Sequence, residues 1–199
     1  NLELKYQWND QDEKPLNKNG LIEIDKTGEL ILQAYKNGKK YGVKKIEKFA
    51  VHLGLNSNIN YQYMYSLSYP AEGLSSLTNG RLGSLDFKDG QWQGFSGENL
   101  DVTISLDSLI SINKVSMNFY QYINSWIVAP NCISIMSSKD SLNWKIIKSV
   151  DSIGEIRKRG KFISSISFDS LETDAKYLKI FAKNYGKLPS WHEAAGAES

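Results

Sequence analysis

Histidines, cysteines and closely spaced carboxylates supply most of the acid–base, nucleophilic and metal-binding chemistry of proteins. This chain of 199 residues has two histidines, His52 and His192, and one cysteine, Cys132. The sequence around them shows neither metal-ligand spacing nor a recognisable Ser, His and Asp constellation. Cys132 lies in an apolar run, where a free cysteine is expected to be a small buried residue. We therefore predict that this chain is not an enzyme by itself.

The five tryptophans are a second class of candidate, although an indole is first of all a core group with a polar handle. Trp92 and Trp144 follow turns and lead into apolar runs, so we expect both to pack. Trp126 ends a polar, aromatic loop at residues 120–126 that also contains Gln121. For Trp126 both packing and ligand binding stay open.

A second candidate loop contains Trp191 and His192, just before a run of small residues at 194–197. An indole beside an imidazole can form one wall of a binding pocket, and Tyr185 and Asn184 are candidates for the opposing wall. The alternative is that this loop is an anchor that plugs the end of the fold.

The charge pattern limits the classes of partner. The formal net charge is +2 and the charges are interspersed, so the basic footprint of a nucleic-acid-binding protein is missing. No apolar stretch approaches the roughly 20 residues that a membrane-spanning helix needs. One basic run, at residues 157–161 (RKRGK), follows a turn and is interpreted as a solvated hairpin. Contact with an acidic glycan or a membrane is the alternative for that run.

The loops that carry these residues must be positioned by strands. Apolar and polar residues alternate at 100–107, 115–119 and 178–182, which is the period of a strand with one buried face. Short apolar runs separated by Gly, Asn and Asp fill the rest of the chain, and no long helical pattern is present. We predict an all-β fold of antiparallel sheets stacked as sandwiches.

Turn-forming residues at 54–58 (GLNSN) predict a boundary between two units. Residues 1–54 are expected to form a small, partial sandwich of four strands at 2–8, 20–24, 29–35 and 44–51. Asn37 and Gly38 are expected to form a hairpin turn with positive φ angles. Residues 55–199 hold most of the aromatic residues, so we expect the functional site in that unit.

Several segments resemble a known family. Residues 77–84 (LTNGRLGS) and 92–95 (WQGF) resemble the opening of a discoidin module, also called coagulation factor 5/8 type C. The later segments 125–130, 138–144 and 183–192 resemble the version attached to family 20 β-N-acetylhexosaminidases, the chitobiase-like enzymes of bacteria. Residues 4–10 and 28–39 resemble the Ig-like domain that follows the catalytic barrel of such enzymes.

The resemblance implies a galactose-binding-like jelly roll of the family 32 carbohydrate-binding class after a partial Ig-like sandwich. In that class, loops at one end of the sheets present aromatic and polar side chains to a sugar. The sugar would be of the galactose, N-acetylgalactosamine or N-acetylglucosamine type. Within such loops, the aromatic and polar residues that we predict to bind the sugar are Gln121, Trp126, Asn184, Tyr185, Trp191 and His192.

The resemblance also implies a structural calcium ion in the turn at 77–84, with Asn79, the carbonyl of Arg81 and Ser84 as ligands. The family usually has Asp where this chain has Asn79, and its last strand, which ends near an Asp-Glu pair, is not found after Ser199. Both departures lower the ligand charge on which calcium affinity depends. The alternative is a plain turn in which Asn79 and Gly80 supply left-handed backbone.

The function that the resemblance implies is that of a non-catalytic accessory region of a bacterial glycoside hydrolase. It would act in the periplasm or outside the cell, with glycans and the catalytic domain of its parent chain as partners. The alternative is a structural spacer that binds no sugar. Glycoside hydrolysis within the chain itself is the third hypothesis and is not expected, because family 20 chemistry needs a barrel of about 250 residues and neither the barrel nor its Asp-Glu motif is found.

Overall fold

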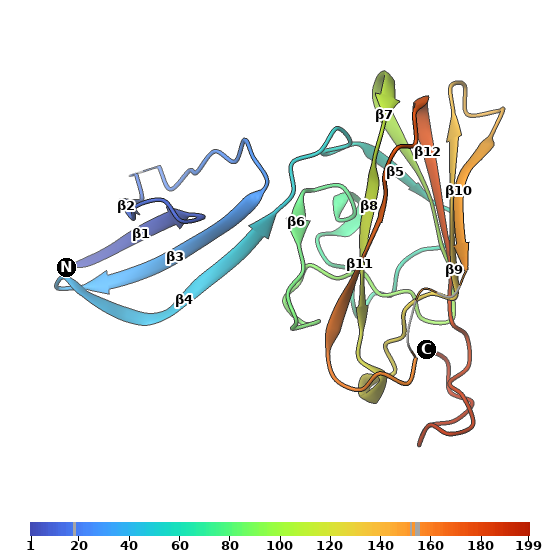
Figure 1. Ribbon diagram of the computed structural model, residues 1–199. Coiled ribbons are helices and arrows are strands. Elements are labelled where there is room, and N and C mark those ends of the chain that lie inside the picture. The colour runs from blue at the N-terminus through green and yellow to red at the C-terminus, as the bar shows by residue number, and fades with distance from the viewer. Residues whose placement is uncertain (18, 152, 154–155) are drawn as a thin grey trace.

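The computed structural model describes residues 1–17, 19–151, 153 and 156–199, and strands dominate its regular structure (Figure 1). Within these ranges the helical elements are two single turns of 3-10 helix, η1 (Gly73–Ser75) and η2 (Ile123–Ser125). No helix in the described part of the chain has the length and hydropathy needed to cross a bilayer. The all-β prediction is confirmed.

The N-terminal sheet is antiparallel and has the strand order β2-β1-β3-β4-β6. The hairpin between β3 and β4 turns at Asn37 and Gly38, whose φ angles of 52° and 78° match the predicted turn. Edge strand β2 is only two residues long and includes Pro15. The strands are β1 (Leu2–Trp8), β2 (Lys14–Pro15), β3 (Gly28–Lys36), β4 (Lys39–Phe49) and β6 (Arg81–Leu82).

The strand predicted at 20–24 is wrong, because the described residues there form no ladder. The Asn17 side chain accepts a hydrogen bond from the Leu21 N–H at 3.3 Å and donates one to the Leu21 carbonyl at 3.1 Å. This local turn uses the backbone groups that a strand would have offered to its neighbour.

Residues 58–183 supply the strands of a two-layer sandwich. One layer is the five-stranded sheet β10-β9-β12-β7-β5, and the other is the pair β11-β8. β10 forms the edge of the larger sheet and is interrupted by a bulge between Ile146 and Lys148. The strands are β5 (Asn58–Tyr61), β7 (Leu100–Ile112), β8 (Val115–Gln121), β9 (Cys132–Ser138), β10 (Lys145–Asp151), β11 (Phe162–Phe168) and β12 (Thr173–Lys183).

The hydrophobic core fills the space between these two layers. Ile133 and Ile135 on β9 are completely buried, and Val102 on β7 is 1% exposed. Val115 and Phe168 reach the same cluster from the two-stranded sheet. The alternation of apolar and polar residues in the sequence therefore did identify the buried faces of the strands.

The long connection between β5 and β7 packs through aromatic rings against the outside of β8. The Phe87 and Trp92 rings lie 6.0 and 5.4 Å from the Tyr120 ring, and the Trp92 indole N–H donates to the Ser84 carbonyl at 3.0 Å. The Trp144 indole N–H donates to the Ser141 carbonyl at 3.1 Å, and its ring is half-buried. The prediction that Trp92 packs is confirmed, and packing of Trp144 stays a prediction.

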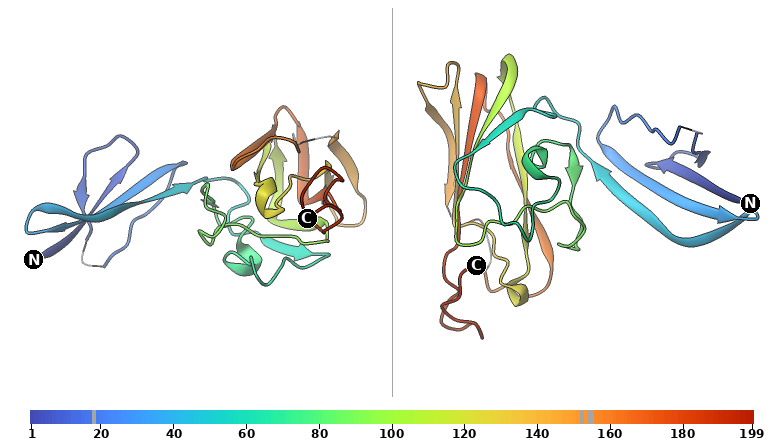
Figure 2. Two further views of the ribbon diagram at one scale, coloured as in Figure 1. Left: turned by 90° about the horizontal axis from the view of Figure 1, so that it is seen from below. Right: turned by 180° about the vertical axis from the view of Figure 1, so that it is seen from behind.

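The N-terminal sheet extends away from the sandwich and meets it through β4 and β6 (Figure 2). The Ala50 N–H donates to the Gly80 carbonyl at 2.7 Å. Gly80 has a φ of 77°, and a β-carbon there would lie 2.8 Å from the Ala50 carbonyl oxygen, so the contact requires glycine. A strand from beyond residue 54 thus completes the first sheet, while the division into two domains at that residue stays a prediction.

Replacing Ile135 with alanine is expected to lower the free energy of unfolding by about 3 kcal/mol, because it leaves a cavity between tightly packed layers. Ile146→Ala on the neighbouring strand is the matched control, since that side chain is 63% exposed, and its cost is expected to stay below about 1 kcal/mol. Urea unfolding of both variants checks this. Equal losses would show that the core does not lie where the structure has it.

Candidate functional site

Three connections emerge at one end of the sandwich. The antiparallel registers pair Gln121 at the end of β8 with Phe162 at the start of β11, and Lys183 at the end of β12 with Cys132 at the start of β9. The chain therefore leaves and enters these four strands at the same end, where η2 and the C-terminal segment gather (Figure 1). The connections are residues 122–131, the described residues 156–161 and residues 184–199.

The first connection holds Trp126 in an exposed position. Tyr122 and Ile127 exchange two backbone hydrogen bonds of 2.9 and 3.3 Å, which close the loop around η2. Trp126 follows η2 with a left-handed φ of 63°, and its side chain is 47% exposed. Left-handed backbone is strained for a residue of this kind, and such strain persists only where the surrounding structure enforces it. The loop thus holds an indole in contact with water.

The C-terminal connection is joined to the first one by His192. The His192 side chain is 9% exposed, its Nε2 donates to the Ile123 carbonyl at 3.0 Å, and its Nδ1 accepts from the Ala194 N–H at 3.0 Å. Both ring nitrogens are engaged, so the imidazole positions the loops, as in the loop-anchor alternative. The neighbouring Trp191 is 45% exposed.

Asn184 is also engaged within the protein. Its side-chain N–H groups donate to the carbonyls of Phe95 at 2.8 Å and Ser199 at 3.2 Å. Its Oδ1 accepts from the Gly186 N–H at 2.6 Å and from the Ser199 hydroxyl at 3.1 Å. This amide fastens the C-terminal segment to the body of the sandwich.

A pocket of about 240 Å³ opens beside the first connection. Two of the predicted site residues, Gln121 and Tyr185, line it. The Asn131 amide donates to the Tyr185 carbonyl at 3.2 Å, which joins two of its walls. The remaining lining residues are Val128, Ala129, Pro130, Asn131, Ile153 and Ile156.

The basic run lies against both tryptophan loops, which its interpretation as an isolated hairpin did not foresee. The Arg157 guanidinium lies over the Trp191 ring at 5.5 Å, and the Lys161 ammonium lies over the Tyr122 ring at 5.4 Å. All four cations of the run are exposed. The pairing of β11 with β8 brings residues 157–161 next to the two tryptophan loops. No sequence motif indicates that pairing.

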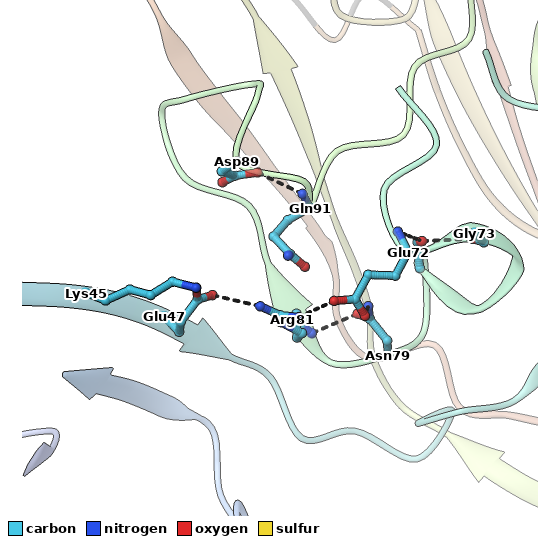
Figure 3. A network of polar contacts seen from close by, with 9 residues as sticks. Lys45, Glu47, Glu72, Gly73, Asn79, Arg81, Asp89 and Gln91 are labelled. Atoms are coloured by element: carbon cyan, nitrogen blue, oxygen red, sulfur yellow. Dashed lines mark hydrogen bonds and ion pairs between the residues drawn. The ribbon is translucent and has the colours of Figure 1, made fainter. Parts of the chain in front are cut away.

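The predicted calcium turn lies elsewhere, at the junction with the N-terminal sheet (Figure 3). The Arg81 guanidinium forms ion pairs with Glu72 and, at 3.4 Å, with Glu47. The Asn79 amide donates to the second carboxylate oxygen of Glu72 at 3.0 Å. The Arg81 guanidinium therefore lies between the carboxylates of Glu47 and Glu72, where a bound cation would otherwise lie.

The predicted ligands are used in ways that do not suit calcium, which takes six to eight oxygen ligands. Asn79 Oδ1 accepts from the Arg81 N–H at 2.9 Å, and the Ser84 hydroxyl accepts from the Asp86 N–H at 3.1 Å. No cluster of three or more His, Cys, Asp or Glu side chains suited to a metal occurs among the described residues. The residues of this turn do not fit the ion.

Glu47 shows the electrostatic effect of the junction. Burial acts to raise its pKa, but the Lys45 ammonium at 2.9 Å and the Arg81 guanidinium outweigh burial and hold the pKa of Glu47 below its ordinary value. A carboxyl group whose pKa is lowered by folding stabilises the folded state above its ordinary pKa and loses that contribution as the pH falls.

Comparison with known proteins gives a weak likeness. No family model matches the chain, and no curated protein matches it. The C-terminal domain of a chitobiase from Bacteroides fragilis is 12% identical, with a TM-score of 0.41 over 72% of this chain and 90% of that one.

Two modules from Clostridium perfringens are similar to a comparable degree. CBM32-3 from a family 31 glycoside hydrolase is 19% identical, with a TM-score of 0.37 over 63% of this chain and 78% of that one. CpGH89CBM32-5, solved with GalNAc-β-1,3-galactose, is 16% identical, with a TM-score of 0.37 over 72% of this chain and 90% of that one. The function of this chain therefore has to be judged from its own residues.

Replacing Arg81 with methionine is expected to cost about 2 kcal/mol of unfolding free energy at pH 7, because Glu47 and Glu72 lose their shared cation. The pKa of Glu47 lies below its ordinary value in the native protein, so this contribution is lost only as the pH falls through that lowered pKa, and the difference from the native protein is expected to shrink toward pH 3. Urea unfolding at both pH values measures this. Lys114→Met, which breaks an exposed pair with Asp169, is the control and should cost under about 1 kcal/mol. A loss that is the same at both pH values would contradict the ion-pair explanation.

Calcium is expected to leave thermal stability unchanged, because Arg81 already occupies the carboxylates of the turn. A site with a Kd of about 10 μM would add about 3 kcal/mol at 2 mM calcium, which corresponds to a rise of several degrees in Tm. Thermal unfolding in 2 mM calcium chloride and in EDTA distinguishes the two cases. A rise in Tm that EDTA reverses would show that an ion binds.

Proposed function

We propose that residues 55–199 form a carbohydrate-binding module whose site lies at the end of the sandwich that carries Trp126 and Trp191. The observation that carries this proposal is the Trp126 indole, which is 47% exposed on left-handed backbone. A residue that only packed would gain nothing from strain that leaves almost half of its surface in water. An indole held in place before a ligand arrives is the arrangement that binding favours.

A sugar suits this surface. A pyranose ring has an apolar face that can lie on an indole and a rim of hydroxyl groups that need hydrogen-bond partners. The pocket beside the loop is lined by Asn131 and Tyr185, which have polar groups, and by Gln121, which is completely buried. The site is open rather than enclosed, so millimolar affinity for a single sugar is expected.

The resemblance in sequence supplies a context for the proposed module. It would belong to a secreted bacterial glycoside hydrolase of the β-N-acetylhexosaminidase kind, working in the periplasm or at the cell surface. By holding the parent enzyme on glycans, it would raise the effective concentration of the catalytic domain at its substrate.

A structural spacer is the second candidate, and the junction favours it. The pairing of β6 with β4 and the ion pair between Arg81 and Glu47 fix the N-terminal sheet to the sandwich. A spacer, however, needs no exposed indoles. The two functions are compatible, and the test below separates a module that binds sugar from one that only braces.

Tryptophan fluorescence of the whole chain is to be titrated with N-acetylglucosamine, N-acetylgalactosamine and galactose. We expect a saturable change with at least one sugar, and a loss of at least about tenfold in affinity for Trp126→Ala, which corresponds to 1.4 kcal/mol. Trp191→Ala is expected to weaken binding as well.

Trp144→Phe is the matched control, because that indole is half-buried and lies at the other end of β9. It should bind like the native protein. If no sugar changes the fluorescence up to tens of millimolar, and Trp126 and Trp191 prove shielded from iodide, the spacer is the better description.

A further inference from the structure

The surface proposed to bind sugar carries a local excess of positive charge. The three connections, in their described parts, carry five Lys or Arg residues against two Glu residues, while the whole chain of 199 residues has a net charge of only +2. Four of the five cations lie within residues 157–161. None of these four forms an ion pair with a carboxylate that the structure describes. All four side chains are exposed.

Two of the cations are held in place by the aromatic residues of the site. Arg157 lies 5.5 Å over the Trp191 ring, and Lys161 lies 5.4 Å over the Tyr122 ring of the Trp126 loop. A cation over an aromatic face is attracted by the ring, so its side chain loses less freedom when a ligand binds. Each tryptophan loop therefore presents one partly ordered cation.

These cations have the chemistry that recognises a carboxylate or a sulfate. The planar guanidinium of Arg157 can donate two parallel hydrogen bonds to two oxygens of one anionic group. Lys161 adds a compact charge on the side of the Trp126 loop. Because Arg157 covers one region of the Trp191 ring, Trp126 is the better surface for the sugar ring and Trp191 the support for the cation.

We propose that the ligand is an anionic glycan, in which a sugar ring lies on Trp126 and a carboxylate or sulfate group binds Arg157 and Lys161. This inference rests on the proposed carbohydrate-binding function and names its substrate class. A glycan is favoured over an anionic membrane, because more than half of the surface of each tryptophan residue is covered by protein, whereas a tryptophan that enters a bilayer projects freely. The pocket of about 240 Å³ lined by residues 128–131 of the first connection also suits a ring rather than a flat lipid surface.

The test compares pairs of sugars that differ only in their anionic group. The pairs are galactose 6-sulfate with galactose, N-acetylglucosamine 6-sulfate with N-acetylglucosamine, and galacturonate with its methyl ester. In 20 mM salt we expect the anionic member of at least one pair to bind about tenfold more tightly, as expected for a few exposed charge contacts. In 500 mM salt, which screens exposed charges, that ratio should fall toward one.

The variant Arg157→Gln/Lys161→Gln is expected to abolish the preference for the anionic member but to keep binding of the neutral one. The control variant Lys139→Gln/Lys145→Gln removes the same charge at the opposite end of β9 and β10, and should keep the preference. Circular dichroism and thermal unfolding check that both variants fold.

The outcomes separate the two proposals. If neutral members bind as tightly as anionic ones, the anionic inference is wrong and the carbohydrate-binding function stands. If no sugar of any pair binds and N-acetylgalactosamine does not bind either, both are wrong. If vesicles of phosphatidylserine bind more tightly than every sugar and depend on the same two cations, the surface is a membrane site and the glycan inference fails.

Discussion

One hydrogen bond, from His192 Nε2 to the Ile123 carbonyl, holds together the two loops on which both exposed indoles lie. The bonded residues are 69 positions apart in the chain, and the bond is buried, where an unmade hydrogen bond is costly. It can form only after β8 and β12 have taken their places in the two layers. The surface at this end of the sandwich is therefore a product of the complete core and not of any single loop.

Strand periodicity was sufficient to predict most of the fold, because burial on one face imposes alternation wherever a strand lies over a core. Val102, Leu106 and Ile180 follow that rule. The rule failed at residues 20–24, where the pattern was suitable but Asn17 bonded the backbone of Leu21. A competing side-chain hydrogen bond leaves no mark on hydropathy. The short β6 was missed as well, because its pairing with β4 depends on contact between distant segments.

The candidate site was only partly predictable. Trp126 and Trp191 stood out as aromatic residues in polar loops. The sequence does not show, however, whether a hydrogen-bonding side chain is already bonded within the protein. His192 and Asn184 have polar groups suited to a sugar, and the fold engages those groups internally. The basic run had been considered for contact with an acidic glycan, but its contacts with the rings of Trp191 and Tyr122 were not foreseen, because only the register of β11 against β8 brings these segments together.

The edge strands of the sheets determine whether neighbouring copies of this protein aggregate when they lie close together. Edge strand β2 includes Pro15, which has no N–H to offer, and edge strand β10 is broken by its bulge and carries Lys145 and Lys148. Long flat edges act as templates on which further chains add strands and aggregate. A protein with such interrupted, charged edges can be packed at high density on a surface and still remain a set of separate molecules.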